Sequence, residues 1–542
     1  MIARVLTLVF ILIVLAAPFA INARSARAPE VDSDAPVVMI VTPHAEQLRT
    51  EFAEGFARWH QRVYDAPARA ELRQPGGTRE IQNQLRAEYN AAVKSGLITP
   101  DGVAERGAVT FDLMFGGGTY EHKRLADDNA VRVAVDGRDE PVTMSMSEPA
   151  GFDEATLRSW YGDRTSAGTE PVYEPDQHWI GSALSSFGIV YNRQVFEDLG
   201  IPEPDGFEDL ADPRLRGWIA LADPRLSGSI VTTMDSVLGY YGWEQGWRVL
   251  RGMCANTRYF TGSSTKPPSD VAQGEAAAGL AIDFYGRAQA QAVLAPGMNP
   301  GEGRVGYVDP RGSVYVDPDP ISVLRGGPNP ELARRFIEYA LSEEGQAVWQ
   351  LPAIETGAGA DNPPGPDGEP LGPRRHELRR LPIRVSMYEK YFDTFIDQVN
   401  LYELASDTRN PGWRTGVTMM LGAACIDTSD EQQAAWAAID RLRVLGAGAG
   451  AETIRAYEDR FYGWPEPARI EAVWNELFGG DDVELPADAL LPWTEANYRA
   501  IRNTWRDGEV ERRLRIVYTR IFAEMYESIV RDINGGPSEE PA

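Results

Sequence analysis

The most constraining feature of this sequence is an apolar run that ends in consecutive glycines. Residues 109–115 (VTFDLMF) have the composition of a buried strand, and Gly116, Gly117, Gly118 and Thr119 follow directly. Glycines at the end of a strand let the backbone approach a ligand closely and leave amide N–H groups free to donate. In open α/β sheets, ligands bind beyond the carboxyl ends of the strands. These four residues are therefore a candidate half of a small-molecule site, and the alternative is a plain turn.

The segment before this loop alternates strands with helices. Residues 37–41 (VVMIV) predict a central strand, and a helix whose apolar positions recur at helical spacing follows His44. Residues 70–72 predict a second strand, and Thr78 is a candidate N-cap of the next helix. A β-α-β-α-β order predicts a parallel sheet with right-handed crossovers. His44 then lies at a strand's carboxyl end, where it either contacts a ligand or simply caps the helix.

A second set of strands begins after a polar stretch over residues 132–175. A strand at 218–221 leads to Ser227, Gly228 and Ser229, which open a predicted helix at 230–241. A helix amino end with free N–H groups and hydroxyls can hold an anion, although Ser227 and Ser229 can also be ordinary caps.

Two further strand ends carry polar side chains. A strand end near residue 260 runs into a hydroxyl-rich loop with Ser263 and Ser264, before a predicted short helix over 271–278. Another apolar run, 279–282, is followed by Asp283, Tyr285 and Arg287. A carboxylate, a phenol and a guanidinium are groups that fix small polar ligands, whereas an Asp283–Arg287 ion pair in solvent is the simpler interpretation.

Composition excludes several classes of protein. The net charge of −27 disfavours nucleic acid or an anionic membrane surface as a partner. Two cysteines, Cys254 and Cys425, exclude a disulfide-rich scaffold and a four-cysteine zinc site, and whether they pair is open. Residues 1–28 combine one early arginine, an apolar run and an A-x-A-like site, which predicts a secretory signal or, if uncleaved, an anchor. The membrane is expected as a partner only through that segment, and only if it is not cleaved.

Several stretches together resemble a known family. They are VVMIVTPHAEQLRTEFAEGFARWH, TFDLMFGGGTYEHKRLADDN, SFGIVYNRQVFEDLGIPEPDGFEDLADPRLRGWIALADP, AAAGLAIDFYG and DPDPISVLRGGPNPELARRFIEYALSEEGQAVW. Over about residues 37–385, this order and spacing resembles the periplasmic substrate-binding proteins of ABC transporters with the type 2 fold. The nearest branch contains binders of ferric iron, thiamine, polyamines, phosphonates and sugar phosphates.

The resemblance implies an α/β fold of two lobes around a hinged cleft. The predicted domains are a first lobe at 37–140 completed by about 305–385, a second lobe at 141–304, an all-α extension at 386–533 and a disordered tail at 534–542. Deleting residues 386–542 is expected to leave ligand affinity intact. The implied protein is an exported, periplasmic or extracytoplasmic monomer that is not an enzyme and hands its solute to a membrane permease.

The resemblance also suggests a choice between two kinds of solute. Ferric-binding members carry adjacent tyrosines where this chain has Phe284 and Tyr285, so the first of the two is missing here. His44 matches their histidine ligand, and Asp283, Tyr285 and His44 form an alternative Fe³⁺ site with fewer donors than that ion prefers. The glycine loop, the serine loops and a helix amino end instead suit an oxyanion such as a phosphate, phosphonate or carboxylate. We therefore expect a small polar organic anion or zwitterion, with Asp283 facing its amine or hydroxyl group, and no resident cofactor or metal.

Two alternatives to solute binding for transport are an exported enzyme and a sensor or adaptor. An exported hydrolase using the same cleft lacks support, because the sequence contains neither G-x-S-x-G nor H-E-x-x-H. A sensor or adaptor would use the helical extension to pass cleft closure to a partner protein.

Overall fold

The computed structural model describes residues 34–135, 139–295, 298, 300–445 and 450–535. The predicted signal segment, residues 1–28, lies outside this range. None of the described helices has the length and apolar character needed to cross a membrane. The chain forms two compact units. Their segments are Met1–Gly116, Arg124–Ala150 and Ile321–Gly345 for the first, and Gly117–Lys123, Gly151–Pro320 and Gln346–Ala542 for the second.

The first unit is built on a mixed sheet. Its strands, in spatial order, are β2 (Arg69–Arg73), β1 (Val37–Val41), β3 (Leu113–Phe115), β16 (Pro320–Leu324) and β6 (Ser147–Glu148). The first three are parallel, as the predicted crossovers require, whereas β16 runs antiparallel to β3. A separate hairpin joins β4 (Val131–Val133) to β5 (Val142–Met144).

Helices cover both faces of this sheet. Successive side chains of a strand point to opposite faces, and in β3 the apolar side chains on each face pack against a different helix. Phe115 of β3 packs with Phe52 of α2 (Glu46–Tyr64) and Phe336 of α10 (Pro330–Leu341). Met114 belongs instead to the apolar cluster formed with α3 (Thr78–Ser95) on the other face. The helix predicted to follow His44 is confirmed as α2, and the apolar residues at helical spacing form its buried face: Leu48, Phe52, Phe56 and Trp59 are all buried.

The second unit also contains a mixed sheet, in which three strands are parallel. Their order is β12 (Thr257–Thr261), β11 (Ile219–Ala222) and β13 (Ala278–Ile282), followed by the long strand β10 (Ala183–Asn192). Strand β10 is antiparallel to β13 and also pairs with β14 (Val305–Val308), β15 (Tyr315–Asp317) and β17 (Leu381–Pro382). The predicted α/β class is thus confirmed in both units.

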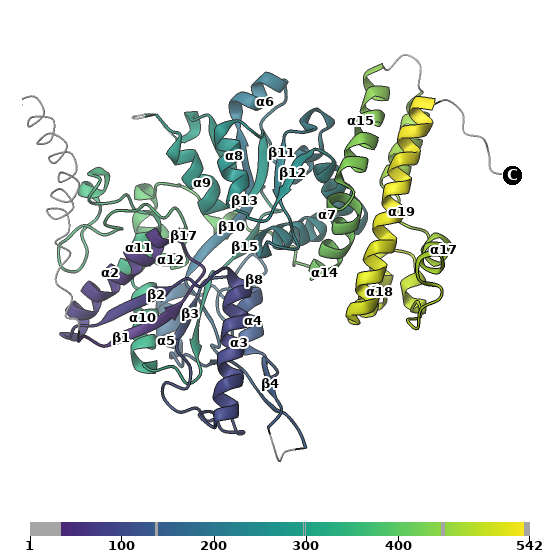
Figure 1. The fold of residues 1–542 in the computed structure, drawn as a ribbon. Coiled ribbons are helices and arrows are strands. Elements are labelled where there is room, and N and C mark those ends of the chain that lie inside the picture. Colours follow the sequence, from purple (N-terminus) through teal and green to yellow (C-terminus); the bar gives the residue numbers. More distant parts are fainter. Residues whose placement is uncertain (1–33, 136–138, 296–297, 299, 446–449, 536–542) are drawn as a thin grey trace, which may run out of the picture. The chain divides into compact units, whose positions relative to one another are not determined.

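The carboxyl-terminal helices belong to this second unit. They are α12 (Val385–Tyr391), α13 (Leu401–Leu404), α14 (Arg414–Gly416), the π-helix η6 (Val417–Ile426), α15 (Ser429–Leu445), α16 (Ala451–Phe461), α17 (Pro467–Phe478), α18 (Glu495–Thr504) and α19 (Gly508–Gly535). In Figure 1, α15 and α19 lie side by side, and one continuous apolar core joins them to η6 and to α7 (Gly228–Ala255). The extension is all-α, as predicted, but it shares its core with the α/β part.

The unit boundaries differ from the predicted lobes in four places. Residues 346–385, which were predicted to complete the first lobe, group with the second unit. Strands β14 and β15 pair with β10, so the chain returns to the first unit at Ile321 and not at about residue 305. Residues 141–150 stay in the first unit because β5 pairs with β4 and β6 with β16. Residues 117–123 group with the second unit. The predicted tail starts inside α19, which includes residues 534 and 535, and its remainder lies outside the described residues.

Some predicted element boundaries were wrong for local reasons. The helix predicted at 230–241 is the first part of a longer element, α7, which continues to Ala255 and is bent at Gly242, where the backbone φ is 75°. The helix predicted at 271–278 is α8 (Lys266–Gln273), because Pro267 and Pro268 occupy a first turn in which no backbone N–H is needed. Thr78 is the first residue of α3, and Gly77 is its N-cap.

Candidate functional site

The carboxyl ends of β12, β11 and β13 gather three of the predicted polar loops in the second unit. The loops follow parallel neighbouring strands, so they emerge at one edge of the sheet. The backbone N–H of Asp223 donates to the carbonyl of Thr261 at 2.8 Å, which ties the loop after β11 to the loop after β12. Ser227, Ser263 and Asp283 therefore belong to a single sheet edge, as their positions in the sequence predicted.

The amino end of α7 is the first component of this edge. Ser227 is buried and is the N-cap, with its Oγ accepting from the N–H of Ile230 at 3.4 Å. The hydroxyls of Ser227 and Ser229 lie 3.1 Å apart, and Gly228 is exposed between them. This turn presents hydroxyls and the positive end of a long helix dipole, which suit an oxyanion.

An arginine from the carboxyl-terminal helices lies beside this helix end. Arg414 donates to the Thr232 hydroxyl at 2.6 Å and to the carbonyl of Gly228 at 3.3 Å. Its guanidinium also stacks on the ring of Tyr120, 4.1 Å from the centroid. Nothing in the sequence pointed to Arg414, because only the folded extension brings it to α7.

The loop after β12 is the most open part of the edge. Ser263 is exposed, and its hydroxyl lies 2.8 Å from that of Thr265. Ser264 is half-buried. Both serines are within the loop that the sequence predicted, and the Ser263 hydroxyl forms a hydrogen bond with another residue of the same loop, Thr265.

Asp283 is the most unusual group of the edge. It is the first residue of α9 (Asp283–Ala292) and is fully buried. Its Oδ1 accepts from the N–H of Phe284 at 2.8 Å, whereas Oδ2 has no hydrogen-bond partner among the described residues. Burial raises the pKa of Asp283 to about 7, which the charges of Arg287 and Arg380 oppose. A buried carboxyl oxygen without a partner is costly, and a ligand hydrogen bond would remove that cost.

Tyr285 and Arg287 have different surroundings, although both belong to α9. Tyr285 is half-buried next to the Phe284 ring, and burial raises the pKa of its phenol. Arg287 is buried, with ion pairs to Asp309 at 2.5 Å and to Asp397 at 3.5 Å. The expected solvent-exposed ion pair of Arg287 with Asp283 is not what the structure has: the Arg287 guanidinium is buried and pairs with Asp309 and Asp397 instead.

The glycine loop changes unit in its middle. Gly116, Gly117 and Gly118 have φ angles of 83°, 108° and 90°, so each adopts a conformation that favours glycine. Gly116 belongs to the first unit, where a Cβ would come within 2.3 Å of the ring of His44. Thr119 belongs to the second, where its N–H and hydroxyl donate to Asp317 at 3.0 and 2.9 Å.

His44 lies in the first unit, just before α2. Its ring is buried and meets Phe115 edge-on, with centroids 4.7 Å apart. Of the predicted site residues, His44 and Gly116 therefore belong to one unit and the others to the second. No group of three or more His, Cys, Asp or Glu side chains suited to a metal occurs among the described residues.

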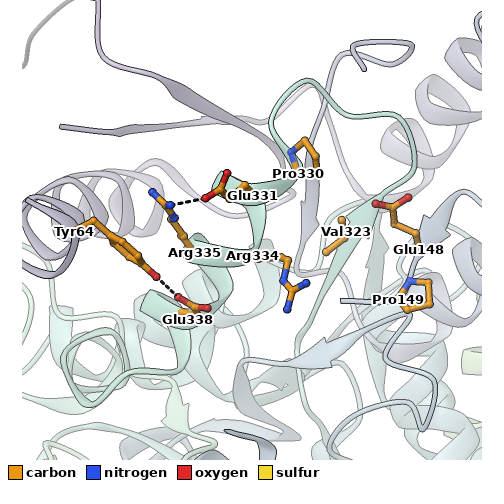
Figure 2. Close-up of a pocket in the computed structure, with 9 residues that line it drawn as sticks. All are labelled: Tyr64, Glu148, Pro149, Val323, Pro330, Glu331, Arg334, Arg335 and Glu338. Atoms are coloured by element: carbon orange, nitrogen blue, oxygen red, sulfur yellow. Dashed lines mark hydrogen bonds and ion pairs between the residues drawn. The ribbon is translucent and has the colours of Figure 1, made fainter. Parts of the chain in front are cut away.

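A pocket of about 560 Å³ in the first unit contains none of the predicted site residues. Figure 2 shows that polar side chains of α10 line it together with Tyr64. The Tyr64 hydroxyl donates to Glu338 at 2.6 Å, and Arg335 pairs with Glu331 at 2.5 Å. These groups satisfy one another, so the pocket is a weaker candidate than the strand edge of the second unit.

The chain thus combines α/β units with polar loops at strand ends, an arrangement typical of proteins that bind small molecules. Residues 160–367 match the family of bacterial extracellular solute-binding proteins, which confirms the resemblance predicted from the sequence over that segment. A search of curated proteins found no match.

Solved structures of periplasmic binding proteins are similar at low identity. AfuA from Actinobacillus pleuropneumoniae, with exogenous fructose-6-phosphate bound, is 18% identical over 58% of this chain and 82% of its own, with a TM-score of 0.42. Iron-bound HitA from Pseudomonas aeruginosa is 15% identical over 70% of this chain and 99% of its own, with a TM-score of 0.44. The sugar phosphate and the iron belong to those two proteins.

The glycine loop can be tested by substitution. We expect Gly117→Ala to weaken solute binding at least tenfold, because a Cβ at φ 108° strains the loop by roughly 1–2 kcal/mol and so changes the conformation of its backbone. Gly96→Ala is the matched control, since Gly96 also has a positive φ of 80° but has open space around it at the end of α3. Calorimetric titration measures affinity and thermal unfolding measures stability. Equal affinity in the two variants would remove the loop from the site.

Proposed function

We propose that this protein is the exported solute receptor of an ABC importer and captures a small polar organic anion or zwitterion. The observation that carries the proposal is the edge of the second sheet, where the capped amino end of α7 and Asp283 follow neighbouring parallel strands, and where Oδ2 of Asp283 has no hydrogen-bond partner in the described part of the chain. The family match over residues 160–367 supports the solute-binding class. The two lobes would close on the solute and present it to a membrane permease.

The two ends of such a ligand call for different chemistry. The hydroxyls of Ser227 and Ser229 and the positive end of α7 favour a phosphate, phosphonate or carboxylate group. Asp283 would face an amine or hydroxyl group at the other end, because its Oδ2, which no described residue contacts by a hydrogen bond, accepts one when the carboxyl is ionised. Ferric iron is the competing cargo, with His44, Asp283 and Tyr285 as its ligands.

Native mass spectrometry with metal analysis, on the protein purified from its own exported fraction, tests the proposal. A co-purified organic anion without iron supports the oxyanion assignment and identifies the substrate class. Stoichiometric iron would overturn the choice of cargo. Chemical conversion of the bound molecule by the purified protein would overturn the receptor function in favour of an enzyme.

The pKa of Asp283 predicts how affinity changes with pH. If Asp283 contacts a ligand amine, binding requires the carboxylate, so affinity rises as the pH increases through about 7. We expect Asp283→Asn to lose about 2 kcal/mol of binding free energy and to abolish this pH dependence. Asp198→Asn, at an exposed position of α6 (Arg193–Leu199), is the control. Calorimetric titration between pH 6 and 8 checks both expectations, and an affinity that falls with pH would mean that the protonated acid donates to an oxyanion.

A further inference from the structure

The only two cysteines of the chain lie together in the core where α7 meets η6. Cys254 is in the last turn of α7 and Cys425 near the end of η6, and both are buried. The side-chain amide of Gln432 donates to the carbonyl of Arg251 and to the sulfur of Cys425, each at 3.3 Å. One amide therefore fixes the Cys425 sulfur beside the end of α7, and the two thiols are near enough for each to shift the pKa of the other.

A buried cation lies next to this pair. Arg251 is fully buried and donates to the carbonyl of Gly463 and the hydroxyl of Tyr526, each at 2.9 Å. In the part of the chain that the structure describes, no carboxylate pairs with this guanidinium. Burial opposes ionisation of Cys425, but the neighbouring Cys254 thiol and the charge of Arg251 outweigh it and lower the pKa of Cys425. The Cys425 side chain, together with burial, raises the pKa of Cys254. In the folded core, Cys425 is therefore the more readily ionised of the two thiols.

We infer that Cys254 and Cys425 form a disulfide bond in the exported protein, which fastens the helical extension to α7. This inference rests on the export that the proposed function includes, because disulfides persist in oxidising compartments. The juxtaposition itself is an observation, since two thiols on elements far apart in the sequence lie in the one apolar core that α7 shares with η6.

The oxidation is a thiol–disulfide exchange with a disulfide donor, either a small-molecule disulfide or a disulfide oxidoreductase. The thiolate of one cysteine attacks one donor sulfur and releases the other as a thiolate, which leaves a mixed disulfide. The thiol of the second cysteine loses its proton and attacks the protein sulfur of that mixed disulfide, which releases the second donor thiol. The two protein thiols are oxidised to one disulfide, and the donor disulfide is reduced to two thiols.

Burial sets the order of events. Because both sulfurs are inaccessible in the folded core, the donor must react before α7 and η6 close on each other. The finished bond closes the loop between residues 254 and 425, and closing a long loop constrains the unfolded chain most strongly. It is also shielded from reductants in the folded protein.

The test is peptide mapping of the full chain purified from its exported fraction. The protein is unfolded without reductant, treated with iodoacetamide and digested. The expected product is one cross-linked peptide pair containing Cys254 and Cys425, seen only without prior reduction. Alkylation of both cysteines in the unreduced sample would overturn the inference.

A second preparation separates this result from the question of export. Full chain made in a reducing cytosol is unfolded and then refolded in a glutathione redox buffer. We expect the same cross-linked pair here, together with a thermal unfolding temperature that falls on reduction in the wild type but not in the Cys254→Ala/Cys425→Ala variant. A bond formed on refolding but absent in the cell would count against export, whereas no bond in either preparation would refute the pairing itself.

Discussion

Deletion of residues 386–542 will leave a chain that aggregates and does not bind solute. The sequence alone suggested the opposite, because the family resemblance stops near residue 385. In the structure, Trp243 and Trp247 of α7 pack against Trp493, with ring centroids 5.1 and 5.9 Å apart. Trp247 also packs against Trp464 at 5.2 Å. Removing the extension would expose these indole rings to water and leave buried Arg251 without its hydrogen-bond partners.

Point variants separate loss of the core from loss of chain length. We expect Trp493→Ala to lower the free energy of unfolding by about 3–5 kcal/mol, since the ring is buried in this aromatic cluster. Val444→Ala is the control on the same extension, because Val444 is 80% exposed and its truncation should change stability by no more than about 0.5 kcal/mol. Denaturant unfolding measures both. A soluble 1–385 fragment with intact solute affinity would show that the shared core is dispensable.

The fold was largely predictable because its two units follow local rules. Apolar runs such as Val37–Val41 became central strands, and helical spacing around Phe52 and Phe56 identified the buried face of α2. The chain's assignment to units was less predictable, since it depends on pairing between distant strands. Residues 305–317 have strand-forming composition, but only the partner β10 decides to which sheet they are added.

The same limit applies to the candidate site. Position after a strand was enough to identify Ser227, Ser263 and Asp283 as neighbours along one sheet edge. It was not enough to find Arg414, which reaches α7 from the extension. Nor could it show that Arg287 is engaged by two aspartates, because Asp309 and Asp397 are far from it in the sequence.

The second large effect is expected from Asp397→Ala. The Asp397 carboxylate is buried and accepts from Nε and Nη2 of Arg379, both at 2.6 Å. It also pairs with Arg287 at 3.5 Å and accepts from Gln350 at 3.2 Å. Removing it leaves Arg379 buried without a counter-ion and Arg287 with Asp309 alone, and loss of one member of a buried charge network costs about 3–5 kcal/mol.

A surface pair on the same unit provides the matched comparison. Asp427 accepts from Arg225 at 2.8 Å, but both side chains are partly exposed and Arg225 keeps a second partner in Asp223. We therefore expect Asp427→Ala to cost at most about 1 kcal/mol. Denaturant unfolding at neutral pH measures the two variants, and similar losses in both would show that the Asp397 network adds no more than a surface ion pair.

The pH dependence of stability distinguishes Asp397 from Asp283. Burial opposes ionisation of Asp397, but the hydrogen bonds from Arg379 and the charge of Arg287 lower its pKa, so its stabilisation is present above about pH 4 and is lost as the pH falls further. The pKa of Asp283 is instead raised to about 7, so the folded state holds its proton more tightly and stability falls as the pH rises from about 4 to 7. Thermal unfolding from pH 3 to 8 measures both effects. In Asp397→Ala, the loss of stability below about pH 4 should disappear, and in Asp283→Asn, the loss of stability between about pH 4 and 7 should disappear. If Asp397→Ala still loses stability as the pH falls below about 4, that loss belongs to other carboxylates.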